Sequence, residues 1–219
     1  MYPKTIEKLI ELFSKFPGVG PRTAARFVFY LTKREKKELE ELSKAISSIS
    51  TSLRRCNFCF NLFQPGQGSQ VSKDEENGQG LCEICSNQSR NRNLLCVVEK
   101  EIDLISIERN KIYKGLYFVL GGTVSGLRKK DFKSLRLSEL RERIKNPEKF
   151  GIKNASFEEI IIAFSSTVEG EATILFLERK LKDLNKKITR LGRGLPTGGE
   201  LEYADRETLS SAFSSRKSG

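Results

Sequence analysis

The 219-residue chain contains no histidine. This absence excludes catalytic triads built on histidine, a histidine general base, and any metal site that needs an imidazole ligand. The sequence also has no apolar run near the roughly 20 residues that a membrane-spanning helix requires, and no signal-peptide pattern opens it. We therefore expect a cytoplasmic protein that is not embedded in a membrane.

Acidic residues are fewer than basic ones. The 39 Lys and Arg residues exceed the 28 Asp and Glu residues, which gives a formal net charge of +11. Such a charge suits a polyanion or an anionic membrane surface as a partner. Residues 1–55 hold twelve basic and six acidic side chains, so about half of the excess lies in this segment.

Three amphipathic helices are predicted within residues 1–55. Apolar side chains recur at helical spacing before and after the break at Gly18 and Gly20, and a third helix covers Glu38 to Leu53. The two glycines permit a tight turn with exposed backbone N–H groups, and Pro21 suits the first position of the helix that follows.

Two arginines follow this turn. Arg22 and Arg26 are one helical turn apart, near a helix N-terminus whose free N–H groups and dipole favour a phosphate. Phe27, Val28 and Leu31 are expected to pack mostly on the opposite face. Taken alone, the stretch is as typical of an ordinary turn between two helices as of a DNA contact.

Two C-x-x-C pairs form the most specific motif in the chain. Cys56 and Cys59 are separated by 22 residues from Cys82 and Cys85. Two such pairs supply the four thiolates of a tetrahedral structural zinc site. Four buried cysteines or two redox pairs remain as alternatives, but the paired spacing favours zinc. A polar, glycine-rich stretch over residues 64–80 is expected to form a mobile surface loop.

From residue 94 onward, short apolar runs alternate with helical patterns. This order is typical of a parallel sheet covered by helices, and Cys96 lies inside one such run as a small core residue. The expected strands are residues 94–99, 116–122 and 159–166, and the expected helices are Glu101 to Arg109, Leu135 to Ile144 and Gly170 to Leu184.

Four acidic residues follow two of these strands: Glu99, Asp103, Glu169 and Glu171. Ligands of α/β sheets bind outside the carboxyl ends of parallel strands, and several carboxylate oxygens there would suit Mg²⁺. Alternatively, Glu171 only stabilises a helix N-terminus and Asp103 lies on a solvated helix face. The spacing does not distinguish these interpretations.

The order of five motifs resembles one family over nearly the whole chain. These are the helix–Gly-x-Gly–helix segment, the four cysteines, "CVVE", "TVEGEAT" and "LPTGGELEY". Together they resemble the RecR family of bacterial recombination mediator proteins. The resemblance implies a multidomain α+β fold with an N-terminal helix-hairpin-helix region (1–55), a small four-cysteine zinc finger with a long polar loop (56–93), an α/β Toprim domain with a parallel sheet (94–190), and a short, partly helical C-terminal assembly segment (191–219).

The resemblance also implies roles for individual residues. It assigns phosphate contacts to Arg22 and Arg26 at the Gly18–Gly20 turn, and it assigns the four paired cysteines to zinc. The Toprim acids fall on Glu99, Asp103, Glu169 and Glu171, as a partner site or a Mg²⁺ site. The implied function is non-enzymatic: binding of single- and double-stranded DNA by a dimer or tetrameric ring in the nucleoid. With RecO, and in some settings RecF, such a protein helps to load RecA onto DNA coated with single-strand-binding protein.

Two other functions remain open. A Mg²⁺-dependent Toprim nuclease or primase would use Glu99 as a base and bind metal through Glu169 and Glu171. A zinc-stabilised protein scaffold would bind partners without affinity for DNA at physiological salt.

Overall fold

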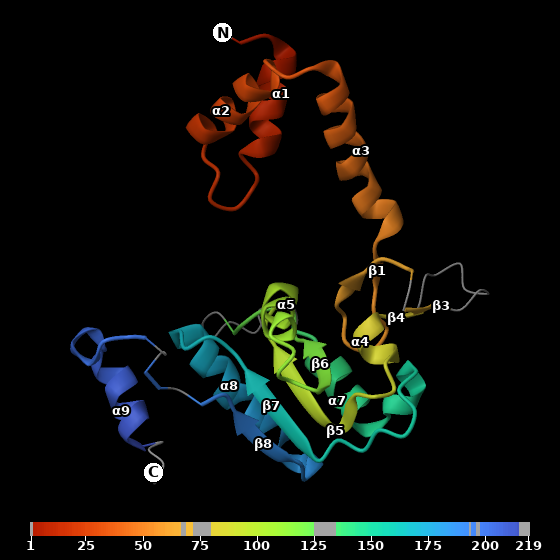
Figure 1. The fold of residues 1–219 in the computed structure, drawn as a ribbon, viewed down its shortest axis with the longest axis vertical. Helices are drawn as coiled ribbons and strands as arrows, with labels where there is room; N and C mark the ends of the chain where they lie inside the picture. Colours follow the sequence, from red (N-terminus) through yellow and green to blue (C-terminus); the bar gives the residue numbers. More distant parts are fainter. Residues whose placement is uncertain are drawn as a thin grey trace. The chain divides into compact units, whose positions relative to one another are not determined.

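A computed structural model of the chain describes residues 2–66, 69–71, 80–124, 135–192, 194–195 and 198–214 (Figure 1). It divides into two compact units, Met1–Leu53 and Arg54–Gly219, and each is described by itself. Within the described ranges, no helix is long and apolar enough to cross a membrane. The polar loop expected between the cysteine pairs lies largely outside these ranges.

The first unit consists of the three predicted helices: α1 (Lys4–Phe13), α2 (Pro21–Leu31) and α3 (Lys36–Ser52). Gly18 has a φ of +76°, a left-handed conformation that glycine adopts without steric cost. Gly20 caps α2 in an extended conformation, and Pro21 occupies the start of the helix. The predicted tight turn before α2 is therefore confirmed.

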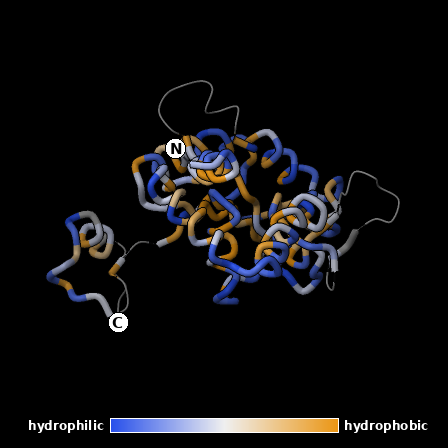
Figure 2. Tube along the Cα trace, turned by 90° about the horizontal axis from the view of Figure 1, so that it is seen from above, coloured by the Kyte–Doolittle hydropathy of each residue, from blue (hydrophilic) through white to orange (hydrophobic). Residues whose placement is uncertain are grey.

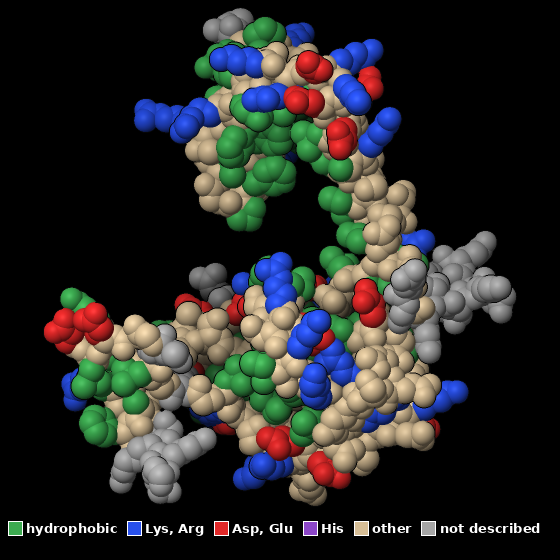
Figure 3. Space-filling view, viewed as in Figure 1, with side chains coloured by type: hydrophobic (Ala, Val, Ile, Leu, Met, Phe, Trp, Pro, Cys, Tyr) green, Lys and Arg blue, Asp and Glu red, His purple; other side chains and the backbone are tan. Residues whose placement is uncertain are grey.

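This unit has little core of its own. Within α1 to α3 only Ala24 and Val28 are buried. The ring of Phe27 lies 6.3 Å from that of Phe13, but Phe27 remains 46% exposed, so the expected packing of this residue is only partial. Figure 3 shows hydrophobic side chains at the surface of this unit, beside projecting Lys and Arg side chains.

The second unit is built on a four-stranded sheet in the order β6-β5-β7-β8, in which every pairing is parallel. The prediction of a parallel sheet is confirmed. The fourth strand was not predicted, because it is a short edge strand with one apolar residue, Ile188. The strands are β5 (Asn91–Val98), β6 (Gly115–Val119), β7 (Glu159–Ala163) and β8 (Lys187–Arg190).

Helices cover both faces of the sheet, as predicted. On β5, Leu95 and Val97 lie in the larger core. This core also includes residues of the cysteine segment (residues 56–85), α7 (Leu137–Lys145) and α8 (Val168–Leu181). The alternate side chains of β5 face α5 (Glu101–Arg109) and include Cys96, which is a core residue as predicted. Hydrophobic stretches of the trace lie mainly inside, with hydrophilic stretches around them (Figure 2).

The remaining elements are short, and four of them are strands that pair into two small ribbons. Each of the two small ribbons is antiparallel. These elements are β1 (Arg54–Arg55) with β2 (Leu62–Phe63), β3 (Gln70–Val71) with β4 (Gly80–Leu81), α4 (Glu83–Ser86), three 3₁₀ helices (Pro147–Phe150, Lys182–Leu184 and Leu201–Tyr203), and the C-terminal helix α9 (Arg206–Ser214).

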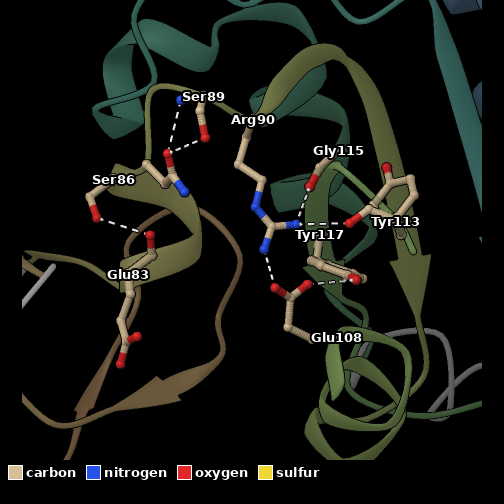
Figure 4. A network of polar contacts seen from close by, with 9 residues as sticks. Glu83, Ser86, Ser89, Arg90, Glu108, Tyr113, Gly115 and Tyr117 are labelled. Atoms are coloured by element: carbon tan, nitrogen blue, oxygen red, sulfur yellow. Dashed lines mark hydrogen bonds and ion pairs between the residues drawn. The ribbon is translucent and has the colours of Figure 1, made fainter. Parts of the chain in front are cut away.

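A polar network centred on Arg90, the residue before β5, joins α5 to the start of β6 (Figure 4). Arg90 forms an ion pair with Glu108 of α5 and donates to the carbonyl oxygens of Tyr113 and Gly115 at the start of β6. The hydroxyl of Tyr117 donates to Glu108 at 3.0 Å. Because this network satisfies the hydrogen-bonding groups of a mostly buried guanidinium, it holds α5 against β6.

Candidate functional site

The four paired cysteines converge on one point. The sulfur atoms of Cys56, Cys59, Cys82 and Cys85 all lie within 4.8 Å of one another, and all four residues are buried. In the described part of the chain, they are the only group of three or more potential metal ligands this close together. The Sγ atoms of Cys59 and Cys82 are 3.6 Å apart, too far for a disulfide bond.

Backbone N–H groups point at these sulfur atoms. The amide of Asn61 donates to Cys59 Sγ, and the amide of Cys82 donates to Cys56 Sγ, both at 3.4 Å. Donors in this position stabilise a thiolate more than a thiol. The first pair is fixed in turn to the sheet, because the amide of Val119 in β6 donates to the carbonyl oxygen of Cys59 at 2.9 Å.

The electrostatics of the cluster suit a cation. Hydrogen bonding from Cys59 and the other thiols holds the pKa of Cys56 below its ordinary range. Burial raises the pKa of Cys59, and hydrogen bonding with Cys56 raises that of Cys85. Four buried sulfur atoms that converge on one point are a donor set that a metal ion such as zinc would complete.

The predicted acidic residues lie at the carboxyl edge of the sheet. Glu99 directly follows β5, and Glu169 and Glu171 lie in the first turn of α8, after the neighbouring strand β7. Glu99 is largely buried and its Oε1 lies 2.6 Å from Nζ of Lys100, while Glu171 lies 3.6 Å from a guanidinium nitrogen of Arg190. Whether these acids share an ion or a partner stays a prediction.

Asp103 has a local structural role. Its carboxylate accepts a hydrogen bond from the amide of Lys100 at 3.0 Å and so caps the N-terminus of α5. The alternative that the sequence left open placed Asp103 on a solvated helix face, and it did not anticipate this capping contact. The role predicted for it in an acidic cluster stays untested.

The hairpin arginines are accessible. Arg22 and Arg26 are both exposed on α2, and neither forms an ion pair with another described residue. A Cβ added to Gly20 would meet no atom within 4 Å, so the chain itself leaves the space beside the N-terminus of α2 open. The arrangement offers two cations beside free backbone donors, as the sequence predicted.

The sequence reasoning missed one positively charged residue beside the cysteine cluster. Arg143 on α7 is buried and bonds to the segment between Cys56 and Cys59. Its residue type does not distinguish it from Arg141, which lies two residues earlier and pairs with Asp183. A weak signal was its position one residue before Ile144 on the apolar side of an amphipathic helix.

Together, the parallel sheet, the acids at its carboxyl edge and the buried cysteine cluster define a Toprim-domain protein with a metal-binding segment. Family models agree: the Toprim domain model matches residues 93–192, the RecR helix-hairpin-helix model matches residues 6–49, and the RecR C-terminal model matches residues 194–217.

A curated relative extends this match to nearly the whole chain. The "Recombination protein RecR" of Chloroflexus aggregans (strain MD-66 / DSM 9485) is 39% identical over 212 residues, which covers 97% of this chain and 93% of the relative. The chain belongs to the RecR family.

Proposed function

We propose that this protein is a non-enzymatic DNA-binding mediator of recombination in DNA repair. The observation that carries the proposal is the hairpin of the first unit, where Arg22 and Arg26 are exposed beside an open helix N-terminus. Phosphate groups are the natural ligands of such a position, and they are shared by every DNA sequence. We infer that the protein acts on single- and double-stranded DNA in the cytoplasm, at the nucleoid.

The central test is DNA binding by the Arg22→Ala/Arg26→Ala double variant. Because these side chains would contact phosphates, the loss of affinity should be similar across DNA sequences. The slope of log affinity against log salt concentration should also become smaller in magnitude by about 2. Binding measured by fluorescence anisotropy at several salt concentrations gives both quantities. The matched control is Lys8→Ala, which removes a cation that already pairs with Glu11 on α1. If the double variant binds as the parent does, the hairpin is not the DNA contact.

We further propose that Cys56, Cys59, Cys82 and Cys85 hold structural zinc. When bound, zinc would supply a tetrahedral crosslink and part of the folding free energy of a segment that has few apolar residues of its own. The chain's own groups already orient the thiols, since two backbone amides donate to the sulfur atoms. Metal analysis of the purified chain should give about one zinc per chain.

Self-association is the next part of the proposal. α3 exposes Leu39, Leu42, Ile46 and Ile49, each between 37% and 59%. With α1 and α2, most of this stripe lines a groove of about 460 Å³. An apolar surface of this kind marks an interface, and a second copy of the chain is the occupant we propose, as part of a dimer or tetrameric ring.

The remaining partners follow from membership of the family. We propose that the protein acts with RecO, and in some settings with RecF, to help load RecA onto DNA coated with single-strand-binding protein. The acids Glu99, Asp103, Glu169 and Glu171 are proposed to form part of a partner or Mg²⁺ site.

The alternative function is a Mg²⁺-dependent Toprim nuclease or primase. It is favoured by the position of Glu99, Glu169 and Glu171 at the carboxyl edge of the sheet. DNA and nucleotides incubated with the protein and Mg²⁺ or Mn²⁺ distinguish the two. Turnover that is lost in Glu99→Gln would establish the enzyme and overturn the non-enzymatic proposal.

A further inference from the structure

Arg143 is a buried cation without a carboxylate partner among the described residues. Its relative exposure is 5%, and none of the ion pairs between described side chains includes it. Burying an uncompensated charge is strongly unfavourable in proteins. A guanidinium in this position therefore implies a source of compensation nearby.

Part of the compensation comes from the cysteine segment. Two nitrogens of Arg143, Nε and Nη2, donate to the carbonyl oxygen of Asn57 at 3.2 Å and 2.8 Å. Asn57 lies between Cys56 and Cys59, so this contact holds the turn that brings the two sulfur atoms together. The third contact, from Nη1, goes to the backbone carbonyl of Glu139 at 3.2 Å.

Aromatic rings enclose the same guanidinium. It lies 4.3 Å from the centroid of the Phe60 ring and 4.0 Å from that of Phe150. Phe60 follows Cys59 directly and has a φ of +65°, a strained conformation for an aromatic residue. The guanidinium of a second arginine, Arg136, lies 4.7 Å from the centroid of the same ring.

These contacts do not supply a full negative charge to balance the guanidinium of Arg143, because carbonyl groups and aromatic rings carry only partial charges. Burial lowers the pKa of Arg143, while Glu139 and Glu142 of the same helix and the sulfur atoms of Cys56 and Cys59 favour its charged form. A divalent ion bound by four thiolates carries excess negative charge. This excess would lie next to Arg143, inside the same core.

We propose that Arg143 is a positioning residue of the cysteine cluster: it balances the negative charge of a metal–thiolate centre and holds the first cysteine pair in place through the Asn57 carbonyl. The inference rests on the proposed metal site and adds a residue that is distant from it in sequence. It also links metal retention to α7, and so to the packing of the Toprim sheet.

The experiment compares zinc retention in full-length variants. Arg143→Gln keeps an N–H donor for Asn57 but removes the charge, whereas Arg143→Lys keeps the charge. Arg141→Gln, which removes a partly exposed cation that pairs with Asp183, is the matched control on the same helix. After zinc per chain is measured, the rate of zinc transfer to a colorimetric chelator is followed, with circular dichroism as a check on folding.

Arg143→Gln should release zinc about tenfold faster than the parent or more, since residues that support metal ligands commonly have effects of this size. Arg143→Lys and Arg141→Gln should stay close to the parent. If Arg143→Gln does not fold, Arg143→Lys decides on charge balance: zinc release close to the parental rate would support it, and release about tenfold faster despite the retained charge would overturn it.

Two other results would contradict it in different ways. Zinc release from Arg143→Gln at the parental rate would show that Arg143 has no such role, with the zinc site intact. A parent chain that holds no zinc at all would instead remove the proposed metal, and the inference with it.

Discussion

Cys96 and the clustered cysteines are all buried, but their surroundings differ. Cys96 packs among the apolar residues of the sheet face that α5 covers. Cys56 lies beside other thiols, a backbone donor and the charge of Arg143. The surroundings of Cys96 favour a neutral thiol, whereas those of Cys56 favour a thiolate that can bind a cation.

A pH dependence follows for Cys96. Burial raises the pKa of its thiol from 9.0 to about 12. Because the unfolded chain then loses this proton at lower pH than the folded chain, the contribution of Cys96 to stability is complete below about pH 9 and is lost as the pH rises toward 12. Urea unfolding between about pH 8 and pH 10 should show a steeper alkaline loss for the parent than for Cys96→Ala. Parallel curves would mean that this thiol titrates alike in both states.

At the level of elements, the backbone is closely packed at the junction between β7 and α8, on the carboxyl edge of the sheet. Thr167 caps α8 by accepting from the amide of Gly170 at 3.1 Å. A Cβ at Gly170 would lie 2.0 Å from the carbonyl oxygen of Ser165. The glycine between Glu169 and Glu171 is therefore required by a close backbone contact, whatever the two acids bind.

Gly170→Ala should consequently destabilise the second unit by about 1–3 kcal/mol, as overpacking does in other well-packed sites. Gly192→Ala is the control, because a Cβ there would meet no atom within 4 Å, and its effect should stay within about 0.5 kcal/mol. Chemical denaturation of both variants measures the difference. Equal stabilities would indicate that the backbone at Ser165 moves away without cost.

At the level of the whole molecule, the two units differ in how much core they contain. Ala24 and Val28 are the only buried residues in the three helices of the first unit, whereas the second unit has a continuous core on one face of its sheet and a smaller one on the other. A unit with so little buried apolar surface gains stability when another surface covers it.

The proposed assembly therefore depends on the α3 stripe. Ile46→Glu places a charge on the exposed stripe, and Ser48→Glu places the same charge two residues away, outside the groove-lining set. Native mass measurement should find the parent and Ser48→Glu as oligomers, and Ile46→Glu shifted toward the monomer. An unchanged mass for Ile46→Glu, or a monomeric parent, would exclude this interface.

Features that depend on neighbours in the chain were predictable from the sequence alone. The two C-x-x-C pairs predicted a four-sulfur cluster, and the alternating patterns predicted helices around a parallel sheet; both are confirmed. The glycines and Pro21 predicted the turn before α2 for the same reason, since backbone conformation is largely a local property.

The tertiary structure decided which side chains are buried and what they contact. Arg141 and Arg143 are close in sequence, yet one pairs with Asp183 at the surface and the other is enclosed beside the cysteine cluster. The apolar residues of α3 have the spacing of a helix that faces a core, but they remain exposed within their unit. Burial depends on segments far apart in the chain, here as far as residue 57 from residue 143, and no local pattern specifies where such segments meet.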